Sequence, residues 1–374
     1  MNKQLPVKIC HLTSVHKAYD VRILLKECRT LAASGYDVVL LVPHERDEVV
    51  DSVCIRKLPL PRNRWDRMFR VVWLMYRVAL SEKADIYHFH DPELIPVGLL
   101  LKLQGRRVIY DVHEDLPRHI LIKPWINARL RKLLMKAAEA GEWLTARIID
   151  GVAAATPVIA RRFPARKTAL IQNFPIIDEL RNSDLLPYSA RSMDVTYVGG
   201  LAKERGTQEI IRAMSLLPET LKARLVLAGT CDEQNLQHEL YRLRNFGKIV
   251  FIGWQTREEI SRLLGNVRVG LVILHPRINY VESQPVKLFE YMAAGIPVVA
   301  SDFPLWRKII DEAQCGLLVD PFNVGGIADA IRWLLENPCE AELMGKRGQE
   351  AVNQQFNWQR EADSLLQLYE NLFS

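Results

Sequence analysis

The chain has 374 residues, 49% of them hydrophobic and 25% charged, a composition typical of a globular protein with two domains. No apolar run reaches the roughly 18 residues that a membrane-spanning helix needs. No signal peptide precedes the first strand pattern, so we expect a cytoplasmic protein. The six cysteines are scattered without a Cys-x-x-Cys pair, which argues against a disulfide framework and a structural zinc site.

Charge is divided unevenly along the chain. The net charge is +6, but residues 1–170 carry +11 and residues 171–374 carry −5. A basic half indicates an anionic partner. We do not expect this partner to be nucleic acid, because the sequence lacks a helix-turn-helix, zinc-finger or aromatic RNA-binding pattern.

Short apolar, β-branched runs alternate with helical patterns along the whole chain. The runs lie at 7–12, 36–42, 85–90, 107–112, 151–156 and 168–173, and then at 194–200, 223–229, 248–253, 269–274, 297–302 and 316–320. Runs that are apolar on both faces are typical of buried parallel strands. The alternation predicts two doubly wound α/β sheets of six strands each. The boundary is expected near 174–192, where no helical or strand period continues.

Two predicted helices of the first half are strongly basic, one within residues 61–80 and one near 129–136. Their basic residues are Arg67, Arg70, Arg77, Arg129, Arg131, Lys132 and Lys136. The first segment also carries several aromatic residues, and such helices can lie on anionic lipid headgroups. The alternative is an ordinary helix that buries its aromatic side chains and exposes its arginines.

Polar side chains follow two buried strands of the first half. His90 and Asp91 come at the end of one strand, and His113 follows the next. Ligands bind at the carboxyl ends of strands in open α/β sheets, so we expect His113 to be functional and the other two to line an acceptor pocket. The alternatives are a structural histidine at 113 and a helix cap at His90.

The segment 282–301 predicts a loop, a helix and a buried strand. Pro285 suits the first turn of the helix, Gly295 ends it, and Pro297 prevents its return. The free N–H groups of the first turn, around 284–287, make a site for a diphosphate.

Two glutamates flank that predicted diphosphate site. Glu282 precedes the helix and is placed to reach a sugar hydroxyl. Glu290 lies about five residues into the helix, roughly 7–8 Å along its axis, which suits a ribose. The alternative is a solvated helix with two ordinary glutamates.

The pattern of Glu282, Glu290 and the following Gly-Ile-Pro-Val-Val resembles the signature of glycosyltransferase family four. Further similar segments lie at 196–206, 250–253, 316–319 and 356–358, so the resemblance covers nearly the whole chain. It implies a retaining enzyme of the GT-B fold, with two Rossmann-like domains facing each other across a cleft. The donor would be a nucleotide-sugar, UDP- or GDP-linked. Because no Asp-x-Asp pattern is present, we expect neither a metal nor another cofactor.

In that family the last helix crosses back onto the first domain, which would explain the helical pattern at 359–373. The resemblance therefore implies an acceptor-binding domain of residues 1–174 plus 359–374. The donor-binding domain would comprise residues 175–358.

The resemblance also implies roles for single residues. His113 and Glu282 would be catalytic, with the histidine pointing at the donor sugar. The donor-binding set would be Gly199, Gly200, Lys203, Arg205, Gly253, Lys287, Leu288 and Glu290. The family places an arginine at position 200 and a lysine at 205. We expect Arg205 to bind the diphosphate, with Lys287 or Lys203 replacing the missing arginine; the alternative for Lys203 is an exposed loop lysine.

The first loop also departs from the family, whose members often carry a Gly-Gly pair there. This chain has polar side chains instead, and we expect His16, Asp20 and Arg22 to contact the acceptor. The alternative for Asp20 is ordinary helix capping.

The family resemblance and the basic first half together predict a lipid-linked or oligosaccharide acceptor, as in surface-polysaccharide or lipopolysaccharide assembly. The protein would then work at the inner face of the cytoplasmic membrane. Two alternatives are a sugar-nucleotide 2-epimerase of the same architecture and a non-catalytic subunit, which Gly200 alone would favour.

Overall fold

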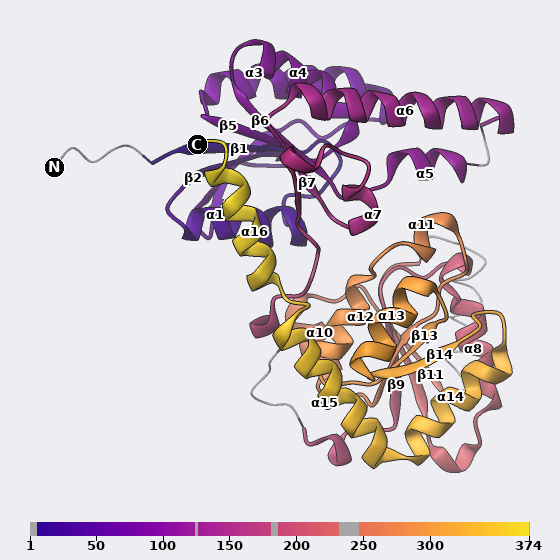
Figure 1. Cartoon of the computed structure of the whole chain (residues 1–374). Coiled ribbons are helices and arrows are strands. Elements are labelled where there is room, and N and C mark those ends of the chain that lie inside the picture. Colours follow the sequence, from indigo (N-terminus) through magenta and orange to yellow (C-terminus); the bar gives the residue numbers. More distant parts are fainter. Residues whose placement is uncertain (1–5, 124–125, 181–185, 232–246, 374) are drawn as a thin grey trace. The chain divides into compact units, whose positions relative to one another are not determined.

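The computed structural model describes residues 6–123, 126–180, 186–231 and 247–373 (Figure 1). The chain divides into two compact units, which are Met1–Asn173 with Gln359–Ser374, and Phe174–Trp358. Each unit is built on one sheet with helices on both faces (Figure 1). Within the described residues, none of the helices combines the length and the apolar character needed to cross a membrane.

The first unit holds an eight-stranded sheet. In spatial order its strands are β3 (Glu48–Val50), β4 (Val53–Leu58), β2 (Asp37–Pro43), β1 (Lys8–Leu12), β5 (Ile86–Phe89), β6 (Arg107–Val112), β7 (Gly151–Ala154) and β8 (Thr168–Leu170). All neighbours are parallel except β3 and β4. The central strands are buried on both faces, as their unbroken apolar runs predicted.

The helices of the first unit cover both faces of this sheet. They are α1 (Arg29–Ala33), α2 (Arg64–Asp66), α3 (Val72–Glu82), α4 (Ile95–Leu103), α5 (Leu116–Leu121), α6 (Ala128–Ile148), α7 (Pro157–Ala160) and α16 (Trp358–Glu370). π-Helical turns η1 (Val21–Cys28) and η2 (Arg67–Val71) precede α1 and α3, and 3-10 turns lie at Pro92–Leu94 and Ala165–Lys167. Figure 1 shows α3, α4 and α6 on one face and α1 and α16 on the other.

The prediction of six strands in the first sheet was wrong, because the hairpin of β3 and β4 was missed. Its longer strand, Val53–Leu58, buries Val53, Ile55 and Leu58 but exposes the adjacent Arg56 and Lys57. Because these two charged residues interrupt it, the strand lacks the continuous apolar run by which the buried strands were recognised.

The second unit holds a six-stranded parallel sheet, as predicted. Its order is β11 (Ile249–Gly253), β10 (Arg224–Ala228), β9 (Asp194–Val198), β12 (Val269–Val272), β13 (Val298–Ser301) and β14 (Gly316–Val319). Its helices are α8 (Thr207–Leu216), α10 (Arg257–Leu264), α11 (Ile278–Val281), α12 (Val286–Ala293), α13 (Pro304–Ala313), α14 (Val324–Glu336) and α15 (Pro338–Gln354). 3-10 turns lie at Ile177–Glu179, Tyr188–Ala190, Lys203–Arg205 and Glu219–Leu221.

The predicted α/β class with two Rossmann-like sheets is confirmed. The expected linker at 174–192 contains only 3-10 turns where it is described, and its residues 181–185 lie outside the described part of the chain. The last helix belongs to the first unit, where Tyr369 of α16 is fully buried. The roles of the two units in binding acceptor and donor, and the cleft, stay predictions.

Candidate functional site

Two glycine turns pack against each other at the carboxyl edge of the second sheet. Gly199 follows β9 and Gly229 follows β10, with φ of +126° and +148°. A Cβ on Gly229 would lie 2.0 Å from the carbonyl oxygen of Gly199, so only glycine fits there. The N–H of Gly229 also donates to the carbonyl of Gly253, 2.7 Å away at the end of β11. The three glycines therefore form one compact backbone surface at a position where α/β sheets bind ligands.

Two cationic side chains converge on this glycine loop. A Cβ built on Gly199 would lie 3.0 Å from Nζ of Lys287, and one on Gly200 would lie 3.7 Å from Nη1 of Arg205. The lysine reaches the loop from the first turn of α12. The structure thus brings the predicted Lys287 and Arg205 together at the predicted Gly199 and Gly200.

The ammonium of Lys287 is the most unusual group of this site. Its Nζ is buried without a hydrogen-bond partner among the described residues, and it lies 3.5 Å from the ring centroid of Tyr197. Burial, followed by the charge of Arg205, holds the pKa of Lys287 well below its ordinary value, against a smaller opposing effect of Glu290. A buried amine beside a second cation and a glycine loop is suited to bind an anion with several oxygens.

Acceptor oxygens without donors lie close to this lysine in the sequence. Among the described residues, Oδ1 of Asn279 on α11 and Oε1 of Gln284 before α12 are buried without hydrogen-bond partners. The predicted Glu282 lies between them in the sequence, at the end of α11, and is half-buried. Such oxygens can accept hydrogen bonds from hydroxyl groups. Asn279 and Gln284 were missed by the sequence analysis, since no motif marks them.

Three other predicted donor residues have definite places in the second unit. The side chain of Leu288 is fully buried in the core, so a contact of this side chain with a ligand is not what the structure shows. Lys203 is exposed in a 3-10 turn, as the alternative interpretation expected. Glu290 is buried on α12 and forms an ion pair with Arg257, which also bonds Glu179. Arg257 was missed because it belongs to another helix, α10.

A second polar cluster lies in the first unit around Asp111, the penultimate residue of β6. One carboxylate oxygen of Asp111 lies 3.0 Å from Nδ1 of His90 and 3.0 Å from Nδ1 of His113. Arg22 donates two hydrogen bonds to the same carboxylate, at 2.9 and 2.6 Å. Burial works against ionisation of Asp111, but Arg22 and the two histidines hold its pKa well below the usual range. Asp111 was missed by the sequence analysis because it lies within the strand rather than after it.

His16 and His113 form a partly exposed pair at the edge of this cluster. Their Nε2 atoms are 2.9 Å apart, and their side chains are 22% and 13% exposed. Burial lowers the pKa of His16, but hydrogen bonding to Asp20 and the charge of Asp91 outweigh it and raise this pKa above its ordinary value. The two histidines line a hollow of about 60 Å³, which has room for a hydroxyl group but not for a whole sugar.

The remaining predicted acceptor residues lie deeper than expected. Arg22, His90 and Asp91 are buried, and their polar atoms bond other side chains of the unit. His90 and Asp91 nevertheless line the same hollow as His16 and His113, whereas Arg22 is not among its lining residues. Contact of these residues with an acceptor stays a prediction. Asp20 caps η1 by accepting from the N–H groups of Arg22 and Ile23, as the alternative interpretation expected.

Comparisons with known proteins agree with this arrangement. The sequence model described as "Glycosyl transferases group 1" matches residues 189–351, and that of the "Glycosyl transferase 4-like domain" matches residues 21–173. A phosphatidyl-myo-inositol mannosyltransferase of Mycobacterium leprae is 22% identical, over 93% of this chain and 92% of its own length. Several other curated relatives match over about half of this chain and less than half of their own length.

Solved structures share the fold over nearly the whole chain. Sucrose-phosphate synthase from Thermosynechococcus elongatus superposes with a TM-score of 0.75 and 21% identity, covering 98% of this chain and 99% of that one. Anabaena HepE in complex with UDP-glucose superposes with a TM-score of 0.73 and 15% identity, covering 97% of this chain and 99% of that one.

The two sheets and their structural relatives define the GT-B fold, and both family matches are to glycosyltransferases. The chain belongs to glycosyltransferase group 1, which is glycosyltransferase family four. It is therefore an enzyme that transfers a sugar.

Proposed function

We propose that this glycosyltransferase moves a sugar from a UDP- or GDP-linked donor to a lipid-linked saccharide at the inner face of the cytoplasmic membrane. The product would serve cell-surface polysaccharide or lipopolysaccharide synthesis. The observation that carries the acceptor part is an exposed aromatic and basic face on the first unit. The donor part rests on the glycine loop with Lys287 and Arg205.

In the second unit the diphosphate would lie on the glycine loop. Arg205 supplies a planar, permanently charged partner, and Lys287 supplies the charge that Gly200 lacks. Glu290 would bind the ribose. Glu282, Asn279 and Gln284 would accept hydrogen bonds from sugar hydroxyls. A UDP-glucose complex of HepE, which has the same fold, supports a nucleotide-sugar as the donor.

The reaction would break the bond between the anomeric carbon and the diphosphate oxygen. Positive charge then develops on the sugar ring and negative charge on the leaving diphosphate, which the two cations stabilise. The acceptor oxygen forms its bond on the same face of the sugar, and its proton leaves with the diphosphate. His113 would hold a sugar hydroxyl during this step.

The membrane part of the proposal rests on side chains that an ordinary helix would bury. Trp65, Phe69 and Trp73 lie within α2, η2 and α3 and are 69%, 68% and 56% exposed. Arginines on the same segment, Arg64 and Arg77 among them, place positive charge beside the rings. Exposed aromatic rings next to arginines are typical of surfaces that rest at a membrane interface.

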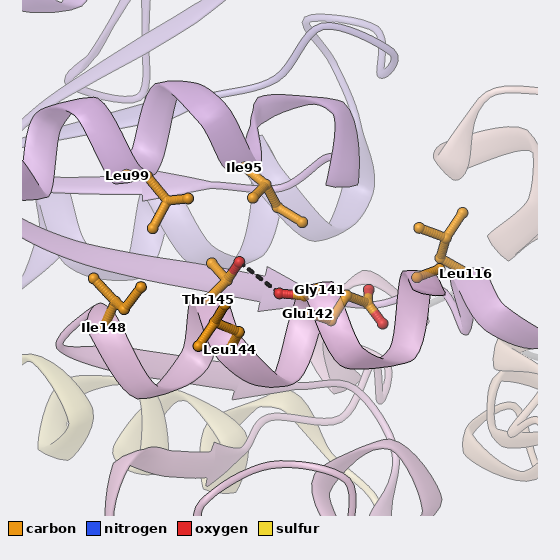
Figure 2. A pocket seen from close by; sticks show the side chains of 9 residues that line it. Ile95, Leu99, Leu116, Gly141, Glu142, Leu144, Thr145 and Ile148 are labelled. Carbon is orange, nitrogen blue, oxygen red and sulfur yellow. Dashed lines mark hydrogen bonds between the residues drawn. The ribbon is translucent and has the colours of Figure 1, made fainter. Parts of the chain in front are cut away.

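An apolar groove on the same layer offers a place for a lipid chain. Figure 2 shows it between α4 and α6, with Ile95 and Leu99 on one side and Leu144 and Ile148 on the other. Its volume is about 300 Å³, and glutamate, threonine and glycine residues are its few non-aliphatic members. Basic residues of α6 could hold the anionic group of a lipid whose chain lies in this groove. The mannosyltransferase relative acts on a phosphatidyl-inositol, as its name states, which supports a lipid acceptor.

The surface proposal is tested by vesicle sedimentation. The variant Trp65→Ala/Phe69→Ala/Trp73→Ala should lose at least tenfold in binding to vesicles with about one third anionic lipid. A matched control is Trp333→Ala on α14, a tryptophan 40% exposed in the second unit, which should bind as the wild type does. Equal binding of the triple variant and the wild type would contradict the proposal.

Neither alternative function gains specific support. The non-catalytic interpretation depended on the missing charge at Gly200, but Lys287 brings a cation to the same loop. The 2-epimerase interpretation shares the architecture only, whereas both family matches are to glycosyltransferases.

A further inference from the structure

Three buried histidines face one another on the sheet of the first unit. His11 on β1 pairs in register with His88 on β5, and His90 follows two positions later on the same side. Their ring centroids are 4.7–5.2 Å apart, and all three side chains are excluded from solvent. Tyr369 of α16 reaches this group with its hydroxyl. A sheet face of this kind normally carries aliphatic side chains.

The four side chains join Asp111 in one unbroken chain of hydrogen bonds. Nδ1 of His90 lies 3.0 Å from a carboxylate oxygen of Asp111. Nε2 of His90 lies 2.9 Å from Nδ1 of His11. Nε2 of His11 lies 3.2 Å from the Tyr369 hydroxyl, which lies 2.7 Å from Nδ1 of His88. Each contact is a normal hydrogen-bond distance.

Only one placement of the protons fits this chain. Asp111, held ionised by Arg22, can only accept, so His90 must carry its proton on Nδ1. Its bare Nε2 then accepts from Nδ1–H of His11, and the bare Nε2 of His11 accepts from Tyr369. The Tyr369 oxygen is then left to accept from Nδ1–H of His88. The same carboxylate fixes His113, whose Nδ1–H also faces it.

Hydrogen-bond accounting at the far end agrees with this placement. It leaves Nε2 of His88 as a bare lone pair at the end of the chain. In the described structure Nε2 of His88 is indeed buried without a hydrogen-bond partner. The assignment therefore leaves no imidazole N–H of the chain without an acceptor.

We propose that Asp111 is a positioning residue that locks His113 as its Nδ1–H tautomer, so that Nε2 of His113 presents only a lone pair to the reacting sugar. The proposal rests on the proposed function in one respect, namely that His113 meets a sugar hydroxyl. In the free chain His16 occupies that place, with its Nε2 donating to Nε2 of His113 across 2.9 Å. A ligand that replaces His16 there must be a donor, and a sugar hydroxyl meets this requirement.

A bound metal is the competing explanation of the buried cluster. His11, Glu27, His88 and His90 offer ligand atoms that lie within 4.8 Å of one another. However, the Tyr369 hydroxyl already lies within hydrogen-bond distance of both His11 and His88. Protons therefore account for the contacts among the three histidines, and a metal becomes an outcome of the test.

The test is the ¹⁵N NMR spectrum of the full chain with labelled histidine. Protonated and unprotonated imidazole nitrogens have well-separated ¹⁵N chemical shifts, so the spectrum shows whether Nδ1 or Nε2 carries the proton. The nine histidines are assigned by removing them one at a time. His11, His88, His90 and His113 should all be Nδ1–H, and zinc chloride at one equivalent should leave them unchanged. A proton on Nε2 of His113, or zinc-induced shifts in the three buried histidines, would overturn the proposal.

Two variants separate positioning from structure. Asp111→Asn offers an amide N–H in place of one oxygen, so His90 or His113 should change tautomer. Because Asp111→Asn also removes the counter-charge of the buried Arg22 and can thereby unfold the chain, Tyr369→Phe provides the second arm. Tyr369→Phe should alter the spectra of His11 and His88 only. A changed tautomer at His113 in this variant would show that Asp111 does not fix the tautomer of His113.

These spectra need neither donor nor acceptor, so a failed transfer assay would contradict the proposed function without touching the tautomer assignment. In a transfer assay, Asp111→Asn should lower kcat by about 10²- to 10⁴-fold. The Kd for UDP or GDP should stay unchanged, because the proposed nucleotide loop belongs to the second unit.

Discussion

At the scale of single residues, we expect Lys287 to affect both the stability of the free protein and its binding of nucleotide. Its ammonium is buried without a hydrogen-bond partner among the described residues. Replacing it by methionine removes a buried polar group of similar length, so Lys287→Met should raise the melting temperature of the free protein. The same change should weaken UDP or GDP binding by about 10- to 100-fold, since a charge-assisted hydrogen bond is lost.

Differential scanning fluorimetry and titration calorimetry measure both effects. The control is Lys203→Met, an exposed lysine of the same loop region, which should change the melting temperature little. A lower melting temperature for Lys287→Met, with unchanged nucleotide binding, would show that the lysine supports the fold rather than the ligand.

The lowered pKa of Lys287 also predicts proton uptake. In the free chain the amine loses its proton at a lower pH than an ordinary lysine, whereas a bound diphosphate favours the ammonium. At a pH between these two pKa values, binding should take up close to one proton. Calorimetry in buffers of different ionisation enthalpy counts it, and Lys287→Met should abolish the uptake. Uptake that persists in the variant would assign the proton to another group.

The sign of the stability effect follows from the same shift. The folded chain binds fewer protons at Lys287 than the unfolded chain does in the window between the lowered folded pKa and about 10.4. Stability should therefore rise with pH across this window, and the rise should be smaller in Lys287→Met. Urea denaturation at several pH values measures the difference.

The pH dependence of stability that His16 contributes has the opposite sign to that of Lys287. The folded pKa of His16 is raised, so its contribution to stability is complete below about pH 6.5 and is lost as pH rises through the folded pKa. His16→Asn should flatten this part of the stability profile. If the profile of the variant still falls over the same pH range, another group is responsible.

At the scale of elements, the turn of Gly199 against Gly229 fixes the loop that holds the cations. Gly229→Ala would place a methyl group 2.0 Å from the Gly199 carbonyl, so the loop must move and nucleotide binding should be lost. Gly105→Ala is a matched control, because Gly105 also has positive φ but no atom within 4 Å of an added Cβ. It should cost about 1–2 kcal/mol of stability and leave binding intact. Intact binding in Gly229→Ala would contradict the role of the turn.

The buried elements could be predicted from sequence, and the exposed ones less so. A continuous apolar run marks the buried strands, whereas β4 was missed because the exposed Arg56 and Lys57 interrupt its apolar run. Helix α12 was located by Pro285 and Gly295, although Pro285 caps the helix instead of lying inside its first turn.

The site could be predicted only where one local pattern held it. Motifs suggested Glu290 and His113, but no motif marks their partners, which are Arg257 on another helix and Asp111 inside a strand. Distances across a sheet depend on packing, which no local spacing reveals. The burial of His90 has the same origin, because the end of a strand can turn its side chain inward as well as outward. Arg22 is buried because η1 turns it toward Asp111.

At the scale of the whole molecule, two Rossmann-like units divide the proposed work. The second unit carries the glycine loop, its two cations and the acceptor oxygens of Asn279 and Gln284. The first carries the histidine cluster, the exposed aromatic rings and the apolar groove of Figure 2. The basic charge of residues 1–170 is then the charge of the unit proposed to meet the anionic membrane.

The most direct test of the central claim is titration calorimetry of the purified chain with UDP, GDP, ADP and CMP and their common sugar conjugates. We predict that either the uridine or the guanosine compounds bind, and that Lys287→Met weakens this binding. No binding by any of these nucleotides at millimolar concentration, in a chain shown to be folded by its cooperative melting, would contradict the account.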